Sequence, residues 1–246
     1  MSQLPSDDLS DRAPDYVASA LKSAVGWVPF AGSLLTEVIG NVVPNQRIDR
    51  LTKFAQIMEK KLQGMEQQFI RSQLNNEFFV DVIEEGLLQA SRSLTDDRRE
   101  HIANLIANSL SQEEIEFVEA KHLLRILGEI NDIEVIWLVS YCDDPLSGID
   151  LDEAFLEKHA DVLTNVITSI QSHEGAFDKE ALQDSYKQHL AQLGLLAPEY
   201  RIDHETGFPI PGRVQGGFDI EDYRITQLGS LLVRFIRNPS PQNQEN

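Results

Sequence analysis

The sequence predicts a mainly α-helical protein, in which an antiparallel helical bundle with an N-terminal apolar helical hairpin precedes a winged-helix-like α+β domain. Three observations support this prediction. Apolar residues recur at three- and four-residue steps between residues 45 and 142. Helix-capping sequences separate these runs. After Gly194 the pattern changes to two strand-like runs around a stretch rich in proline and glycine.

The composition is that of an ordinary folded chain. Of 246 residues, 41% are hydrophobic and 25% are charged, and the mean hydropathy is -0.26. These values argue against a disordered or a membrane-spanning protein. The chain length fits one elongated body or two domains. We predict disordered tails at 1–14 and 238–246, a helical bundle over 15–142 and a winged-helix-like domain over 143–237.

The most apolar stretch, residues 17–43, is the predicted helical hairpin. Lys22 and Glu37 interrupt it, and its uncharged part, 23–36, is too short to span a bilayer. Proline at 29 bends it, glycines at 26, 32 and 40 allow a turn and close helix approach, and a proline at 44 ends it.

The bundle helices follow in order. The apolar spacing predicts a long amphipathic helix over 45–71 and two more over 77–92 and 95–110. Another follows a capping box at 111–114, and Asn131 with Glu134 repeats this signal before an apolar run.

The C-terminal domain begins after the turn cluster at 143–148. We expect helices from Asp150 to about residue 170 and from Asp178 to residue 194. Two strands, 200–203 and 220–225, should enclose the proline- and glycine-rich excursion. Thr226 should cap the last helix.

The charge indicates which partners are favoured. The net charge is -19 and the pI about 4.6, with acids in large excess between 143 and 222. Such a field repels phosphate backbones. The candidate recognition helix, 179–193, has no basic surplus, so a protein-binding or dimerising winged helix is favoured over a nucleic-acid reader. A single cysteine and acids in the first dozen residues predict a cytoplasmic protein.

No residue set predicts catalysis, a cofactor or a metal site. The six histidines do not fall in metal-binding spacing, and no nucleotide-binding or nucleophile motif is present. Cys142 ends an apolar helix, where a buried thiol is common. We therefore predict a non-enzymatic protein that acts through protein–protein contacts, with itself or with a partner.

A membrane-acting effector is the alternative, and a winged-helix transcriptional regulator is a further one. The basic helix 45–61 directly follows the apolar hairpin 17–43, a combination that anionic lipid attracts. Burial of the hairpin against the bundle competes with this interpretation. The predicted membrane or partner contacts are Trp27, Phe30, Leu34, Leu35, Arg47, Arg50 and Lys53.

Several short segments resemble the bacterial abortive-infection alpha proteins over about residues 25–235. They are Pro29 with Gly32, Arg47 with Arg50, the segments 101–108 and 123–132, Leu193-Gly-Leu and Ile225-Thr-Gln-Leu-Gly229. Ile102 stands where that family usually has a tryptophan. The resemblance implies a non-enzymatic helical protein of anti-phage defence, and it names no catalytic residue.

Overall fold

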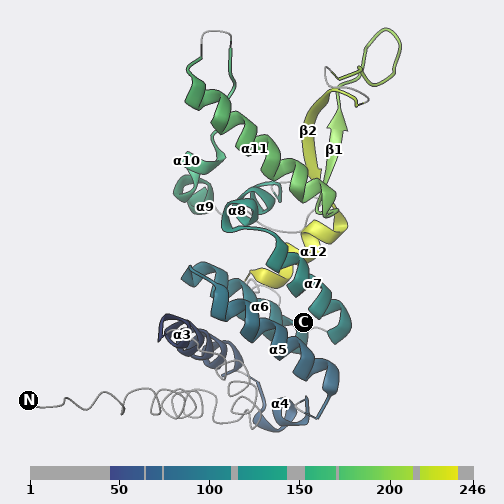
Figure 1. Cartoon of the computed structure of the whole chain (residues 1–246). Helices are drawn as coiled ribbons and strands as arrows, with labels where there is room; N and C mark the ends of the chain where they lie inside the picture. The colour runs from purple at the N-terminus through teal and green to yellow at the C-terminus, as the bar shows by residue number, and fades with distance from the viewer. Residues whose placement is uncertain are drawn as a thin grey trace, which may run out of the picture. The chain divides into compact units, whose positions relative to one another are not determined.

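The computed structural model describes residues 45–63, 65–73, 75–111, 116–142, 153–169, 172–212 and 217–237. These residues form a mainly helical protein with a two-stranded antiparallel sheet, as the sequence predicts (Figure 1). The predicted tails and the hairpin 17–43 lie outside the described residues. The chain divides into two compact units, which are described separately. Unit 1 comprises residues up to Gly128 together with those from Phe235, and unit 2 comprises Glu129–Arg234. The predicted boundary between 142 and 143 therefore lies inside unit 2.

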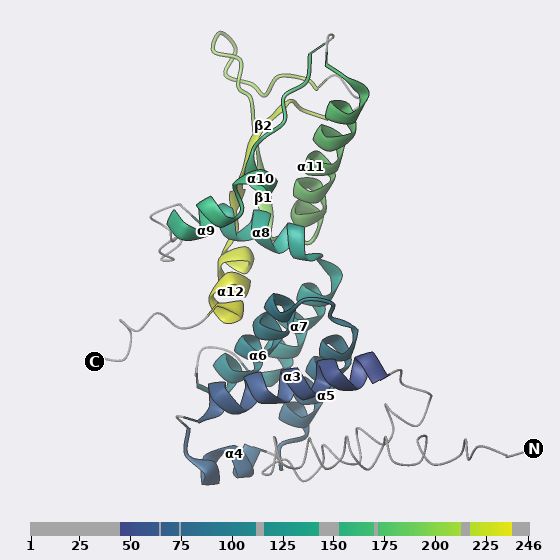
Figure 2. The same cartoon turned by 90° about the vertical axis from the view of Figure 1, so that its left-hand side faces the viewer.

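Among its described residues, unit 1 contains five complete helices, each of which buries apolar side chains. They are α3 (Asn45–Leu62), α4 (Gln67–Gln73), α5 (Glu77–Arg92), α6 (Asp96–Ser111) and α7 (Phe117–Glu129). Helix α3 lies across α5 and α6 (Figure 2) and buries Leu51, Phe54 and Met58 there.

The predicted helix over 45–71 is wrong at one point, because the chain turns between α3 and α4. The Met65 amide donates to the Leu62 carbonyl at 3.0 Å, and Gly64, a poor helix former, stands in this connection.

Polar side chains of α6 hold the end of the last helix, α12 (Gln227–Ile236), whose final residues belong to unit 1. Asn104 donates to the Ile236 carbonyl at 2.8 Å, and Asn108 donates to the Phe235 carbonyl at 2.9 Å. Both asparagines are buried. They satisfy carbonyls that a helix end otherwise leaves without partners.

Unit 2 contains α8 (Asp132–Ser140), α9 (Glu153–Lys158), α10 (Ala160–Leu163), α11 (Glu174–Gln192), β1 (Leu196–Tyr200) and β2 (Ile220–Ile225). Helix α11 packs against α8 and β1 (Figure 1). Gly194 follows α11 with φ +74°, a backbone conformation that favours glycine and stops the helix. Strand β1 pairs with β2 in antiparallel register, Leu196 opposite Ile225 and Tyr200 opposite Ile220.

Three boundaries of unit 2 differ from the prediction. The helix expected to reach residue 170 ends at Leu163, because buried Gln183 of α11 binds the following segment: its amide group donates to the Thr164 carbonyl and accepts from the Val166 amide. Helix α11 begins at Glu174 rather than at Asp178. The first strand is 196–200 rather than 200–203, because pairing with β2 fixes its position.

The capping box that begins α8 is confirmed. The Asn131 side chain accepts from the Glu134 amide at 3.0 Å, and the Glu134 carboxylate accepts from the Asn131 amide at 2.7 Å. The second oxygen of buried Glu134 lies 2.7 Å from Nδ1 of His189 on α11. The same carboxylate therefore caps α8 and ties α8 to α11. Lys187 of α11 lies over the Trp137 ring, 4.6 Å from its centre.

Candidate interaction surfaces

Two surfaces of the described residues present large apolar side chains beside unpartnered charges. The first is in unit 2 and extends beyond the paired strands, between Tyr200 and Ile220 (Figure 1). We call its described residues, 200–212 and 217–220, the arm. The second is a groove between α5 and α7 of unit 1.

Backbone hydrogen bonds hold the arm in a defined conformation. The Arg201 amide donates to Asp219, the Asp219 amide to Ile210 and the Ile210 amide to Arg201, each at 2.8 Å. Three segments of the arm are thus joined in a closed triangle. Such mutual bonding restricts the segment far more than an ordinary long loop.

The tip of the arm is a tight turn. One Asp203 carboxylate oxygen accepts from the amides of Glu205 and Thr206, at 2.8 and 3.1 Å. Gly207 supplies the positive φ of +72° that reverses the chain, and the Asp203 amide donates back to the Phe208 carbonyl. Phe208 therefore projects from a fixed position.

The arm exposes five large apolar side chains, which are between 38% and 72% exposed. They are Tyr200, Ile202, Phe208, Phe218 and Ile220. The rings of Tyr200 and Phe218 pack edge to face with centres 5.6 Å apart. Concentrated exposed apolar area of this kind marks interaction sites in folded proteins.

The arm also carries acidic residues. Asp203, Glu205 and Asp219 lie on it, and of its described bases Arg201 is already paired with Asp219 at 3.2 Å. The Glu205 carboxylate has no partner among the described residues. The arm therefore presents apolar groups in a negative setting.

The groove has an apolar end and a cationic end. Helices α5 and α7 run in the same direction, since Phe79 packs on Phe117 with ring centres 5.2 Å apart and Gln89 donates to the Leu124 carbonyl at 2.7 Å. Between them lies a hollow of about 560 Å³. Phe78 and Val118, 60% and 55% exposed, form its apolar end.

The charges of the groove are unequally satisfied. Asp81 forms an ion pair with Lys121, and the Glu119 carboxylate accepts from the Glu116 amide at the start of α7. His122 and Arg125 line the same hollow, and neither has a partner among the described residues. An imidazole and a guanidinium are thus left free beside exposed apolar side chains.

The residues that the sequence singled out as contacts are not those of the arm or the groove. Trp27, Phe30, Leu34 and Leu35 lie outside the described residues. On α3, Arg47 is exposed, Arg50 donates to the Ser91 carbonyl at 3.4 Å, and Lys53 lies 3.6 Å from Asp96. Two of the three predicted bases are therefore used within unit 1.

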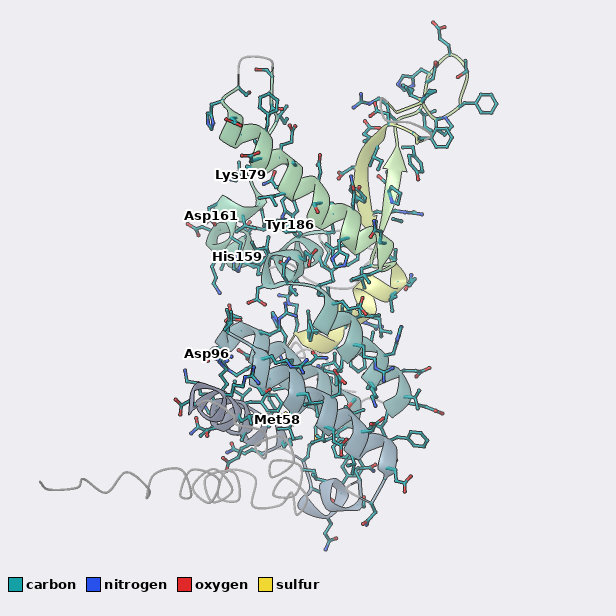
Figure 3. All side chains as sticks on the ribbon, in the orientation of Figure 1. Met58, Asp96, His159, Asp161, Lys179 and Tyr186 are labelled. Atoms are coloured by element: carbon teal, nitrogen blue, oxygen red, sulfur yellow. The ribbon has the colours of Figure 1, made fainter. Side chains whose placement is uncertain are left out.

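Within the part of the chain that the structure describes, three or more histidine, cysteine or acidic residues nowhere come together as a metal-binding group. Cys142 is buried after α8. Within the same residues, no helix is long and apolar enough to cross a membrane. In Figure 3 the labelled Asp161 and Lys179 lie on α10 and α11 of unit 2, and His159 directly precedes α10.

Comparisons of the chain with protein-family models, curated proteins and solved structures find no match.

Proposed function

We propose that this chain is a non-enzymatic, cytoplasmic protein-interaction protein that binds through the arm of unit 2. The exposed apolar cluster on the arm is the observation that supports this function. Its backbone is already bonded into one conformation, so binding costs little conformational entropy. Its aromatic side chains are of the type that contributes most to protein interfaces.

Unit 2 is winged-helix-like in this proposal. The order α8, α10, α11, β1, arm, β2 matches such a domain, with α11 as the recognition helix and the arm as the wing. Helix α11 carries Glu174, Asp178, Glu180 and Asp184 against Lys179 and Lys187. The helix and the arm both carry an excess of acids, so they cannot neutralise phosphates and release the cations condensed on a nucleic acid. This favours a protein partner over the transcriptional-regulator alternative.

The resemblance to the abortive-infection alpha proteins supports a role for this interaction in anti-phage defence. The membrane-acting alternative depends on residues 17–43, so it stays a prediction. The helix α3 that would support it is only in part available for lipid, because Arg50 and Lys53 already have partners in unit 1.

A photo-crosslinking experiment tests the function. The photoreactive amino acid p-benzoylphenylalanine is placed at position 208 in the full chain, which is then expressed in its native cells. The matched control is the same substitution at Glu157, an exposed residue of α9 that is not part of the arm. We expect protein adducts from position 208 that position 157 does not give. Equal labelling from both positions, or none from 208, would contradict the proposal.

A further inference from the structure

We infer that the arm of one copy of this chain docks in the α5–α7 groove of a second copy. This inference rests on the proposed function and names the occupant of both surfaces. The arm tip and the groove carry complementary features, and each is exposed among the described residues.

The tip supplies an apolar anchor with a carboxylate beside it. Phe208 is 72% exposed, and the Glu205 carboxylate, three residues earlier in the same tight turn, has no partner among the described residues. Because Asp203 fixes the turn with two hydrogen bonds, the ring and the carboxylate are presented together.

The groove supplies the opposite arrangement. Phe78 and Val118 offer apolar area for an aromatic ring, and Arg125 and His122 offer donors for a carboxylate. The acids of the groove do not oppose this contact strongly, since Asp81 is neutralised by Lys121 and Glu119 is bonded to the α7 backbone. A desolvated pair between Glu205 and Arg125 would fix the orientation of the tip.

Charge also decides against pairing of two arms. Asp219 of the arm is paired with Arg201, but Asp203 and Glu205 of each arm would face their own copies, and like charges in contact oppose association. The cationic end of the groove removes this repulsion. A second copy of the groove is therefore a better occupant for the arm than a second arm.

The geometry makes the contact heterologous, because two different surfaces meet. Each bound copy keeps one free arm or one free groove, so association continues into a ring or an open chain. The contact is small, which predicts weak association that depends on protein concentration.

Sedimentation velocity over a concentration series of the full chain tests this inference with paired variants. Phe208→Ser removes the anchor of the arm, and Arg125→Glu reverses the charge of the groove. We expect the wild type to form oligomers and each variant alone to be monomeric. A mixture of the two should form only dimers, because the intact arm of the Arg125→Glu variant enters the intact groove of the Phe208→Ser variant.

Matched controls change similar residues elsewhere. Phe177→Ser removes another exposed phenylalanine in unit 2, and Arg92→Glu reverses another exposed charge at the end of α5. Both should still form oligomers. Adding Glu205→Lys to Arg125→Glu should restore association by exchanging the charges of the pair.

Three results would overturn the inference: a wild type that stays monomeric at all concentrations, oligomers that neither Phe208→Ser nor Arg125→Glu weakens, or a mixture that gives no dimer. The crosslinking experiment separates this failure from failure of the proposed function. Adducts from position 208 to a different protein, with a monomeric chain, would retain the function and remove the second copy as its partner.

Discussion

At the scale of single residues, Asp96 shows how an exposed acid can matter in unit 1. It begins α6, and Figure 3 labels it there. Its carboxylate binds Arg99, whose side chain is buried and also donates to the Ser93 carbonyl at 2.8 Å. A hydrogen bond from Arg99 holds the pKa of Asp96 below its ordinary value, with smaller contributions from the charges of Arg99 and Lys53. The acid therefore balances a buried cation.

This lowered pKa predicts a specific pH dependence for Asp96→Asn. An acid whose pKa is lower in the folded state stabilises that state above its unfolded pKa and ceases to do so as pH falls through the folded value. We expect the variant to be less stable than the wild type at pH 7, and the difference to shrink steadily below about pH 4. Urea unfolding at several pH values measures it.

The control for that experiment is Glu59→Gln on α3. Glu59 is exposed and has no partner among the described residues, so its substitution should change the free energy of unfolding little at any pH. A difference between wild type and Asp96→Asn that stays constant down to pH 3 would contradict the role assigned to the carboxylate.

Single residues also show which part of the candidate surfaces the sequence could not predict. The proline- and glycine-rich stretch was predicted as an excursion between strands, but the triangle of Arg201, Ile210 and Asp219 depends on three backbone segments meeting in space. His122 and Arg125, whose side chains have no partner among the described residues, line a groove only because α5, from an earlier part of the chain, lies beside them. A linear pattern contains neither relation.

At the scale of elements, the close packing of α12 on the end of β1 depends on Gly229. A β-carbon at this position would lie 2.3 Å from the Leu195 carbonyl oxygen and 2.8 Å from the Ile225 side chain. The Leu195 carbonyl cannot move easily, because it accepts from the Thr226 amide at 3.0 Å and from the Thr226 hydroxyl at 3.1 Å. Thr226 also caps α12 through the Gly229 amide, as the sequence predicts.

We therefore expect Gly229→Ala to lower the free energy of unfolding by about 2–3 kcal/mol, the cost of forcing extra volume against fixed backbone. Gly217→Ala is the matched control, since nothing lies within 4 Å of its β-carbon position and its φ is not positive. That change should stay within about 0.5 kcal/mol. Chemical denaturation of both variants measures the difference, and equal losses would refute the packing argument.

Elements were predicted well where their signals are local. The apolar stripe of α3, the bounds of α5 and the capping box of α8 follow from residues within one or two turns of each other. The end of α10 and the position of β1 were not predicted, because Gln183 and β2 determine them from distant parts of the sequence. Tertiary contacts there outweigh local helix and strand preference.

At the scale of the whole molecule, the acidic surplus is concentrated in unit 2. The acids of α11, the strands and the arm are at 174, 178, 180, 184, 199, 203, 205, 219, 221 and 222, against described bases at 179, 187, 201 and 224. Unit 1 has the basic helix α3 to offset its acids, through ion pairs such as that of Lys61 with Glu100 at 3.0 Å. The sequence predicted this imbalance correctly, since charge can be counted without knowing the fold.

The imbalance predicts that salt affects the two units differently. Repulsion among like charges opposes the compact state of unit 2, and screening becomes effective at about 8–10 Å near physiological ionic strength. Raising NaCl from about 50 to 500 mM should therefore slow hydrogen exchange in α11, whereas it should leave α6 unchanged or faster because the unit 1 ion pairs weaken. Hydrogen exchange with mass spectrometry reads both helices in one intact chain. As a control, sodium salts with different anions should change hydrogen exchange equally at equal ionic strength if screening is the cause. If α6 and α11 respond to salt in the same way, the charge of unit 2 does not limit its stability.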